Sequence, residues 1–298
     1  MKKTLVAVCA LVSLFASGAA SWKNLDDKAH VCGEKLTADD LLGKVVLVYY
    51  WDLSEEKSIK YIPEVEKVWD SFKTKKFVVV GNYIGSRDDA KIKAAAEKNK
   101  LSVPVYCNFT LDPDPKPGFG KAPYFVAVSH RGTALYTGSS AKEATEKVVE
   151  AINAIGMPVS LCQDVELKKF KGLAAQLKLG KNISNTVKML EKKKGDKDPN
   201  VASEAQEILS AIDRAKEDVK ADIDIYKEVD PAESMKIVQM FMKTWPKDEA
   251  VAGYKEQMHD LKKAASEKAK ADKSRAKDKA KDKDKDKEKE KESKEKES

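Results

Sequence analysis

Residues Val45 to Glu64 read Val-Val-Leu-Val-Tyr-Tyr-Trp-Asp-Leu-Ser-Glu-Glu-Lys-Ser-Ile-Lys-Tyr-Ile-Pro-Glu. The run Val45–Tyr50 is aliphatic or aromatic without a break, which is typical of a strand buried on both faces. A helix is expected from about Glu55 to Phe72, because apolar side chains recur there at helical spacing. Pro63 lies inside that range and predicts a kink. The sequence therefore predicts a buried strand that leads directly into a helix.

The rest of the first half alternates between strand and helix patterns. The predicted elements are a strand at Phe77–Asn82, a helix over 86–99, a strand at Val103–Cys107, a hairpin of Tyr124–Val128 and Thr133–Thr137, and a helix over 140–155. Strands that alternate with helices and end in a hairpin favour an α/β domain with a central mixed sheet and helices on both faces.

After residue 157 the sequence predicts helices alone. The candidates are 163–178, 182–193, 199–227, 231–244 and 247–264, separated by glycine and proline. The last two resemble a tetratricopeptide-type helical hairpin, although no repeat of fixed period accompanies them. An all-α helical domain is therefore expected at 158–264, after a first domain at 21–157.

The C-terminal segment 265–298 contains no aromatic or large aliphatic residue, and from Lys281 it alternates lysine with aspartate or glutamate. Such a segment cannot bury enough apolar surface to offset the entropy of ordering, so a disordered charged tail is predicted. An alternative role is a weak, salt-sensitive tether to acidic surface polymers.

Residues 1–20 have the pattern of a signal peptide. Lys2 and Lys3 precede an apolar stretch too short to span a bilayer, and small residues follow it. The expected location is outside the cytoplasm, in a bacterial periplasm or secreted, with no transmembrane segment. The net charge of +7 belongs largely to this segment and to the tail, which has 14 basic and 11 acidic residues. Clustered positive charge is not expected on a folded face, which argues against nucleic-acid binding.

Three cysteines follow the signal peptide: Cys32, Cys107 and Cys162. They form no Cys-x-x-Cys. One disulfide with one free thiol, or three structural thiols, both fit an exported protein. The three histidines are scattered, so neither a metal site nor another cofactor is expected.

The stretch Val45–Pro63 resembles the active-site entry of a thioredoxin-like thiol–disulfide protein. In that family a strand ends in an aromatic residue and Trp, a Cys-x-x-Cys opens a helix, and Pro follows five residues after the second Cys. Trp51 and Pro63 match, but Glu55-Glu56-Lys57-Ser58 stands where the cysteine motif would be.

Two further segments carry the same resemblance. Gly120–Gly132 is similar to the loop of the family that enters a cis-proline and a strand, which implies a cis bond at Ala122–Pro123. Phe77–Cys107 is similar to the additional strand and helix of the exported redoxin-type branch.

Thiol–disulfide exchange needs a thiolate nucleophile, which Glu55 and Ser58 cannot supply. The resemblance therefore predicts a redox-inactive binding or scaffold module rather than an enzyme. Its groove would be formed by Trp51, Ala122, Pro123 and Tyr124 and would take a protein or an extended peptide. Two alternatives remain: an atypical oxidoreductase that uses Cys107 with Cys32 or Cys162, and a chaperone-like holder of extended peptides.

Overall fold

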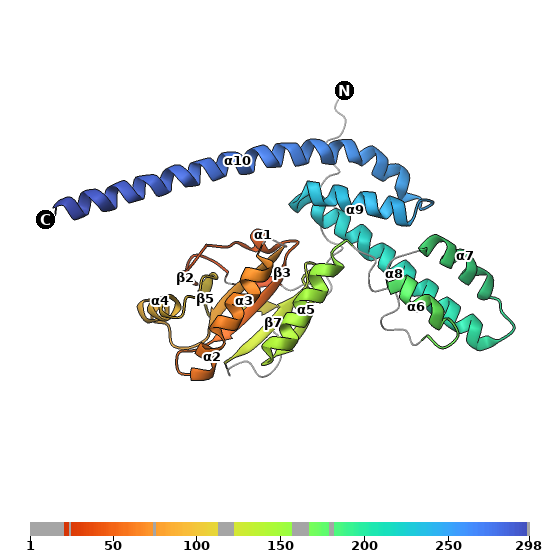
Figure 1. Cartoon of the computed structure of the whole chain (residues 1–298), viewed down its shortest axis with the longest axis horizontal. Helices are drawn as coiled ribbons and strands as arrows, with labels where there is room; N and C mark the ends of the chain where they lie inside the picture. Colours follow the sequence, from red (N-terminus) through yellow and green to blue (C-terminus); the bar gives the residue numbers. More distant parts are fainter. Residues whose placement is uncertain are drawn as a thin grey trace, which may run out of the picture. The chain divides into compact units, whose positions relative to one another are not determined.

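The strand predicted at Val45–Tyr50 is the centre of the first of two compact units, which span Met1–Ile155 and Gly156–Ser298. The computed structural model describes residues 21–23, 25–73, 76–112, 122–156, 167–178 and 182–296 (Figure 1). The predicted signal peptide at 1–20, most of the loop before Pro123 and Cys162 lie outside the described residues.

The first unit contains eight described strands and five described helices. They are β1 (Ser21–Lys23), β2 (His30–Cys32), α1 (Ala38–Leu41), β3 (Val45–Trp51), α2 (Glu56–Lys60), α3 (Ile62–Phe72), β4 (Phe77–Tyr83), α4 (Asp89–Lys98), β5 (Val105–Cys107), β6 (Thr110–Asp112), β7 (Tyr124–Val128), β8 (Ala134–Gly138) and α5 (Ala141–Ala154). Six of the strands form one sheet in the order β2-β5-β4-β3-β7-β8, and β1 pairs with β6.

The connections in this sheet define a thioredoxin-like fold, as the sequence predicted. Strands β3, β4 and β5 are parallel, whereas β7 runs antiparallel to β3 and joins β8 in a hairpin. Successive parallel crossovers in one direction place their helices on one face of the sheet. Residues of α3, α4 and α5 accordingly share one apolar cluster with that face.

The second face differs from the expectation of helices on both sides. Its cluster is closed by Ala29, Leu36, Phe109 and Leu111. The one-turn α1 contributes the buried Leu41, and the partly buried Trp69 of α3 packs against it. Extended segments cover this face because the chain crosses from β3 to β4 and from β4 to β5 in the same direction.

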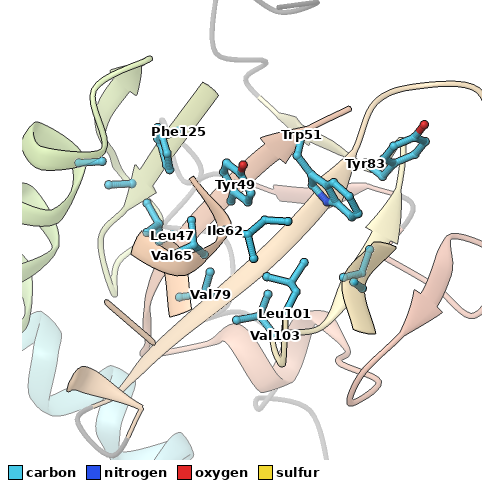
Figure 2. Packing of buried hydrophobic residues seen from close by; sticks show 14 of the residues in the cluster. Leu47, Tyr49, Trp51, Ile62, Val65, Val79, Tyr83, Leu101, Val103 and Phe125 are labelled. Atoms are coloured by element: carbon cyan, nitrogen blue, oxygen red, sulfur yellow. The ribbon is translucent and has the colours of Figure 1, made fainter. Parts of the chain in front are cut away.

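Every residue of β3 is buried, so the strand contributes side chains to both apolar clusters. Leu47, Tyr49 and Trp51 point to the face that carries α3, where they meet Ile62 and Val65 (Figure 2). Each such side chain stabilises the fold by about 1.5–3 kcal/mol relative to an exposed position.

The helix predicted to run from Glu55 to Phe72 is two helices. Tyr61 ends α2 and begins α3, with Pro63 in the first turn of α3. Proline has no amide hydrogen and its ring clashes with the preceding turn, whereas a first turn tolerates it. The result is a break rather than the kink expected from the sequence.

The second unit consists of helices, as predicted. They are α6 (Lys171–Lys178), α7 (Ile183–Lys193), α8 (Pro199–Val229), α9 (Pro231–Thr244) and α10 (Ala250–Lys296). The prediction of a helix over 163–178 was too long, since residues 167–170 are not helical. The Glu204 carboxylate of α8 accepts the amide hydrogens of Lys168, Lys169 and Phe170 at 2.8–2.9 Å, which fixes this segment in a non-helical conformation.

Gly156 begins the second unit in a conformation that only glycine adopts readily. Its φ is +66°, and a β-carbon there would lie 2.6 Å from the Ile237 side chain. Its amide donates to the fully buried carboxylate of Asp222 at 2.8 Å. The chain is therefore fixed at the point where the helical unit begins.

Helix α10 runs from Ala250 to Lys296, and the predicted disorder of the charged tail stays a prediction. The start of α10 is packed, with Val251, Tyr254 and Leu261 buried. A packed first part removes the cost of helix nucleation, and the alanine, lysine and glutamate that follow are good helix formers. Contact with the unit extends past residue 264, since Lys268 donates to the Val229 carbonyl. No helix among the described residues is long and apolar enough to cross a membrane.

Deletion of residues 271–298 is expected to change the melting temperature by less than about 4 °C, because this segment contains no large apolar side chain to bury. Differential scanning calorimetry measures the change. Leu261→Ala, at a position only 3% exposed, is the matched control and is expected to lower the melting temperature clearly. A larger drop for the deletion than for Leu261→Ala would contradict this prediction.

Candidate functional site

The predicted site residues gather at one edge of the main sheet. Trp51, Tyr83 and Cys107 are neighbours in register at the carboxyl ends of β3, β4 and β5. Tyr124 at the start of β7 pairs with Tyr50, because β7 is antiparallel to β3. Ligands of open α/β sheets commonly bind outside the carboxyl ends of the parallel strands, so this edge is the candidate site.

Ser58, which the sequence resemblance placed at the second cysteine position, closes the loop between β3 and α2. Its side chain is fully buried. Its hydroxyl oxygen lies 2.7 Å from the Asp52 carbonyl and 2.8 Å from the Glu55 carbonyl, and it accepts the Asp52 amide hydrogen at 3.1 Å. The Tyr49 hydroxyl donates to the Ser58 carbonyl. Ser58 is therefore a structural hydrogen-bonding group and has no exposed reactive atom.

Glu55, at the position of the first family cysteine, is exposed at the N-cap of α2 and its side chain makes no capping hydrogen bond. The Asp52 carboxylate accepts the Ser54 amide hydrogen. The neighbouring Glu56 forms an exposed ion pair with Lys60 at 2.8 Å, and the hydrogen bond from Lys60 lowers the pKa of Glu56. These carboxylates lie in solvent, which does not favour acid–base catalysis.

Tyr83 packs against Trp51, with ring centroids 5.2 Å apart at 72° (Figure 2). Burial raises the pKa of Tyr83, and the nearby Asp52 charge raises it further. A β-carbon at Gly85 would lie 2.5 Å from the Tyr83 hydroxyl oxygen, so a larger residue there would displace the end of the Tyr83 or Asp52 side chain. The loop after β3 is thereby held against the end of β4.

Neither described cysteine is an activated thiol. Cys107 is buried, its sulfur accepts from Asn108 Nδ2 at 3.4 Å, and burial raises its pKa in spite of the nearby Arg87 charge. Burial also raises the pKa of Cys32, and the nearby Lys93 charge offsets only part of this increase. A thiol with a raised pKa has little thiolate at neutral pH and is a poor nucleophile.

Cys32 and Cys107 are also too far apart to form a disulfide in this register. Cys32 lies opposite Val105, whereas the amide of Cys107 bonds the Ala29 carbonyl. A stagger of two residues along the strand, added to the distance between strands, separates their Cα atoms by about 8 Å. Disulfides need less than about 7 Å. Both thiols are free, and Cys162 lies outside the described residues.

The residues predicted to form a groove share this edge of the sheet but differ in accessibility. The Ala122–Pro123 peptide bond is cis. Ala122 and Pro123 are buried, and Trp51 is wholly inside the core. Tyr124 is half-buried, with its ring 6.2 Å from that of Tyr50. Of the four side chains, Tyr124 is thus the one that a partner can contact most readily.

Sequence reasoning missed a surface groove of about 330 Å³ between α3 and α5. Leu47, Val65 and Phe125 form its apolar floor, and the charged residues Glu64 and Lys142 are among those that line it. No short motif encodes this groove, because its residues come from four separate elements. Among the described residues no group of His, Cys, Asp and Glu is placed to hold a metal ion.

The sequence matches no protein-family model and no curated protein. Similar solved structures include the thioredoxin domain of a thiol-disulfide oxidoreductase from Bacteroides vulgatus, which is 20% identical over 46% of this chain and 95% of that chain, with a TM-score of 0.36. A thiol:disulfide interchange protein from Chlorobium tepidum is 15% identical over 45% of this chain and 94% of that chain, also with a TM-score of 0.36. A thiol-disulfide oxidoreductase from Bacteroides fragilis is 20% identical over 45% and 98%, with the same TM-score.

Ser58→Ala is expected to destabilise the first unit by about 1–3 kcal/mol, because it leaves buried backbone groups of the β3–α2 loop without their partner. Urea unfolding followed by near-ultraviolet circular dichroism measures the change. The matched control is Ser54→Ala, in the same loop but exposed, which is expected to have little effect. Equal effects of the two substitutions would show that Ser58 does not close the loop.

Proposed function

We propose that this chain is an exported, redox-inactive protein of thioredoxin-like fold that binds a protein or an extended peptide. The observation that carries the proposal is the pair at the degenerate cysteine positions: Glu55 is exposed, and Ser58 is buried and bonded to backbone. Export is supported by the signal-peptide pattern at 1–20. The fold is retained while the nucleophile of the family's chemistry is missing.

The absence of exchange chemistry follows from how thiols react. A disulfide is broken by attack of a thiolate on sulfur, and a carboxylate or an unactivated hydroxyl does not perform this step. The described thiols, Cys32 and Cys107, have raised pKa values and are out of reach of each other. A binding role is therefore favoured over an enzymatic one.

Tyr124 is the group that we assign to partner contact. It is half-buried beside Pro123, and aromatic side chains contribute large contact areas at interfaces. The groove between α3 and α5 opens on the same unit and offers an apolar floor. A segment of a partner with an exposed aromatic or aliphatic side chain fits these surfaces.

The second candidate is an atypical oxidoreductase centred on Cys107. The observation that favours it is position, since Cys107 is the register neighbour of Tyr83 at the candidate edge. It would require Cys162 as the second thiol, because Cys32 is out of reach. A peptide-holding chaperone uses the same surface as our first proposal and differs from it in having many weak partners.

The chain as it stands is expected not to reduce insulin disulfides in the presence of dithiothreitol above the rate of the thiol alone. The double variant Glu55→Cys/Ser58→Cys is expected to gain turnover, because it restores an exposed thiol at the N-cap of α2 and a buried one at residue 58. Activity of the unmodified chain that disappears in Cys107→Ser would overturn the redox-inactive proposal and support the second candidate.

Capture of a partner from the exported fraction by the full chain is expected to weaken at least about five-fold in Tyr124→Ala, since truncation of an interface aromatic commonly costs more than about 1 kcal/mol. Quantitative mass spectrometry of the bound fraction measures the loss. Glu55→Ala, exposed at the same edge, is the control and is expected to retain capture. Equal capture by both variants would place the binding surface elsewhere.

A further inference from the structure

A strongly basic surface lies at the start of the helical unit. Residues 167–198 contain ten lysines and three acidic residues, which gives a net charge of +7, whereas the other residues of 21–264 together have a net charge of −5. This differs from the expectation that no folded face carries clustered positive charge. We call the lysines of this segment that the structure describes as exposed the basic face; they are Lys168, Lys169, Lys171, Lys188, Lys192, Lys193, Lys194 and Lys197.

Contacts within the unit hold both ends of the basic face near the start of α8. The Glu204 carboxylate fixes residues 168–170 through their amide hydrogens. Lys169 also forms an ion pair of 3.1 Å with Asp198, which is the N-cap of α8. Because only residues 194–198 separate α7 from α8, the lysines that end α7 lie near the same point. The lysines therefore belong to one folded surface.

Helix α7 carries its lysines on its exposed side. Its buried side chains are Ile183, Thr186 and Leu190, and the helix packs against α8. Lys188 and Lys192 are one turn apart, so their side chains are neighbours. Met189 lies beside them and is 38% exposed, which makes it one of three large hydrophobic residues exposed in the described part of the chain. The exposed side of α7 thus combines positive charge with an apolar side chain.

Much of this charge is not neutralised by the chain itself. Lys193 and Lys194 pair with Asp196 and Glu191, each at 2.7 Å. Within the described residues, no acidic partner accompanies Lys171, Lys188, Lys192 and Lys197. A lysine in the last turn of a helix interacts favourably with the helix macrodipole, which accounts for Lys192. The other three have no such structural role, so their charge is available to an external anion.

We infer that the basic face binds the surface of a membrane that contains anionic phospholipids. The segment contains no arginine, the residue that recognises phosphates and bases through a planar pair of hydrogen bonds, whereas lysine acts as a compact point charge. Lysines alone suit a dense array of charge in which no single group has to be positioned, as on a lipid surface. The inference does not depend on the proposed peptide-binding function.

Met189 favours a lipid surface over a soluble polyanion, because an apolar side chain among lysines fits the boundary between headgroups and acyl chains. The contact stays at the surface, since the buried side of α7 is occupied by α8 and no described helix is long and apolar enough to cross a membrane. Salt screens exposed charges beyond about 10 Å at 0.1 M and about 3 Å at 1 M. Binding is therefore expected to be reversible and to be lost at high salt.

The test is sedimentation of residues 21–298 with vesicles of equal parts phosphatidylcholine and phosphatidylglycerol, and with vesicles of phosphatidylcholine alone. Binding is expected only to the anionic vesicles. Lys188→Gln/Lys192→Gln is expected to lower the partition coefficient at least about ten-fold, because each lysine near an anionic surface adds to the attraction. The matched control is Lys57→Gln/Lys98→Gln, which removes the same charge at exposed positions of the first unit and is expected to retain binding.

Two further variants sharpen the test. Met189→Gln is expected to weaken vesicle binding at least about three-fold, because an apolar contact is lost, and to leave any binding of soluble polyphosphate unchanged. Lys171→Gln/Lys197→Gln changes the same face outside α7 and is expected to act as the α7 double variant does. All substituted side chains are exposed, so the variants are expected to fold, and an unchanged circular dichroism spectrum checks this.

Absence of binding to the anionic vesicles would overturn the inference. Equal losses in the lysine variants and in the control would do so as well, since net charge alone would then explain the binding. Polyphosphate that binds as tightly as the vesicles, with no effect of Met189→Gln on either, would assign the face to a soluble polyanion instead. Loss of binding on deletion of residues 271–298 would place the contact on the charged tail.

Discussion

Burial of β3 on both faces is the constraint on which the thioredoxin-like unit depends. All seven of its side chains are in the interior, and its backbone is paired to β4 on one side and β7 on the other. A strand placed in this way has no free surface along its length. The residues that meet solvent or a partner must therefore lie where the strand ends, after Trp51. The location of the candidate site follows from the packing and not from any particular chemistry.

The same constraint explains the role of Ser58. The loop after β3 has to turn sharply into α2, which leaves backbone groups of Asp52 and Glu55 partly shielded from water. Buried polar groups are costly unless they are hydrogen-bonded, and the Ser58 hydroxyl supplies those bonds. Tyr49 and Tyr83 hold the loop from the two strands beneath it. The Ser58 hydroxyl thus holds the loop through its hydrogen bonds to the backbone.

Much of this fold was accessible from the sequence because its signals are local. Most elements were predicted to within a few residues. The signals were the apolar run at Val45–Tyr50 and the glycine and proline residues between the helices of the second unit. The features that the sequence did not predict depend on contacts with residues far away along the chain. The short strands β1 and β6 have no pattern of their own, and residues 167–170 are kept out of a helix by Glu204, which lies more than thirty residues further along the chain. The burial of Trp51 and the stagger of Cys32 against Cys107 likewise depend on strand register, which a single sequence does not reveal.

The buried Glu204 gives the helical unit a sensitivity to acid. Burial on its own would raise the pKa of this carboxyl group, but the amide hydrogen bonds from Lys169, Phe170 and Lys168 outweigh it and hold the pKa below the ordinary value. Its contribution to folding is therefore complete above the unfolded pKa of about 4.3 and is lost as the pH falls through the lower, folded value. A protonated Glu204 no longer presents a charged acceptor to three amides. The segment that enters α6 is thus where an acidic environment loosens this unit through a single proton.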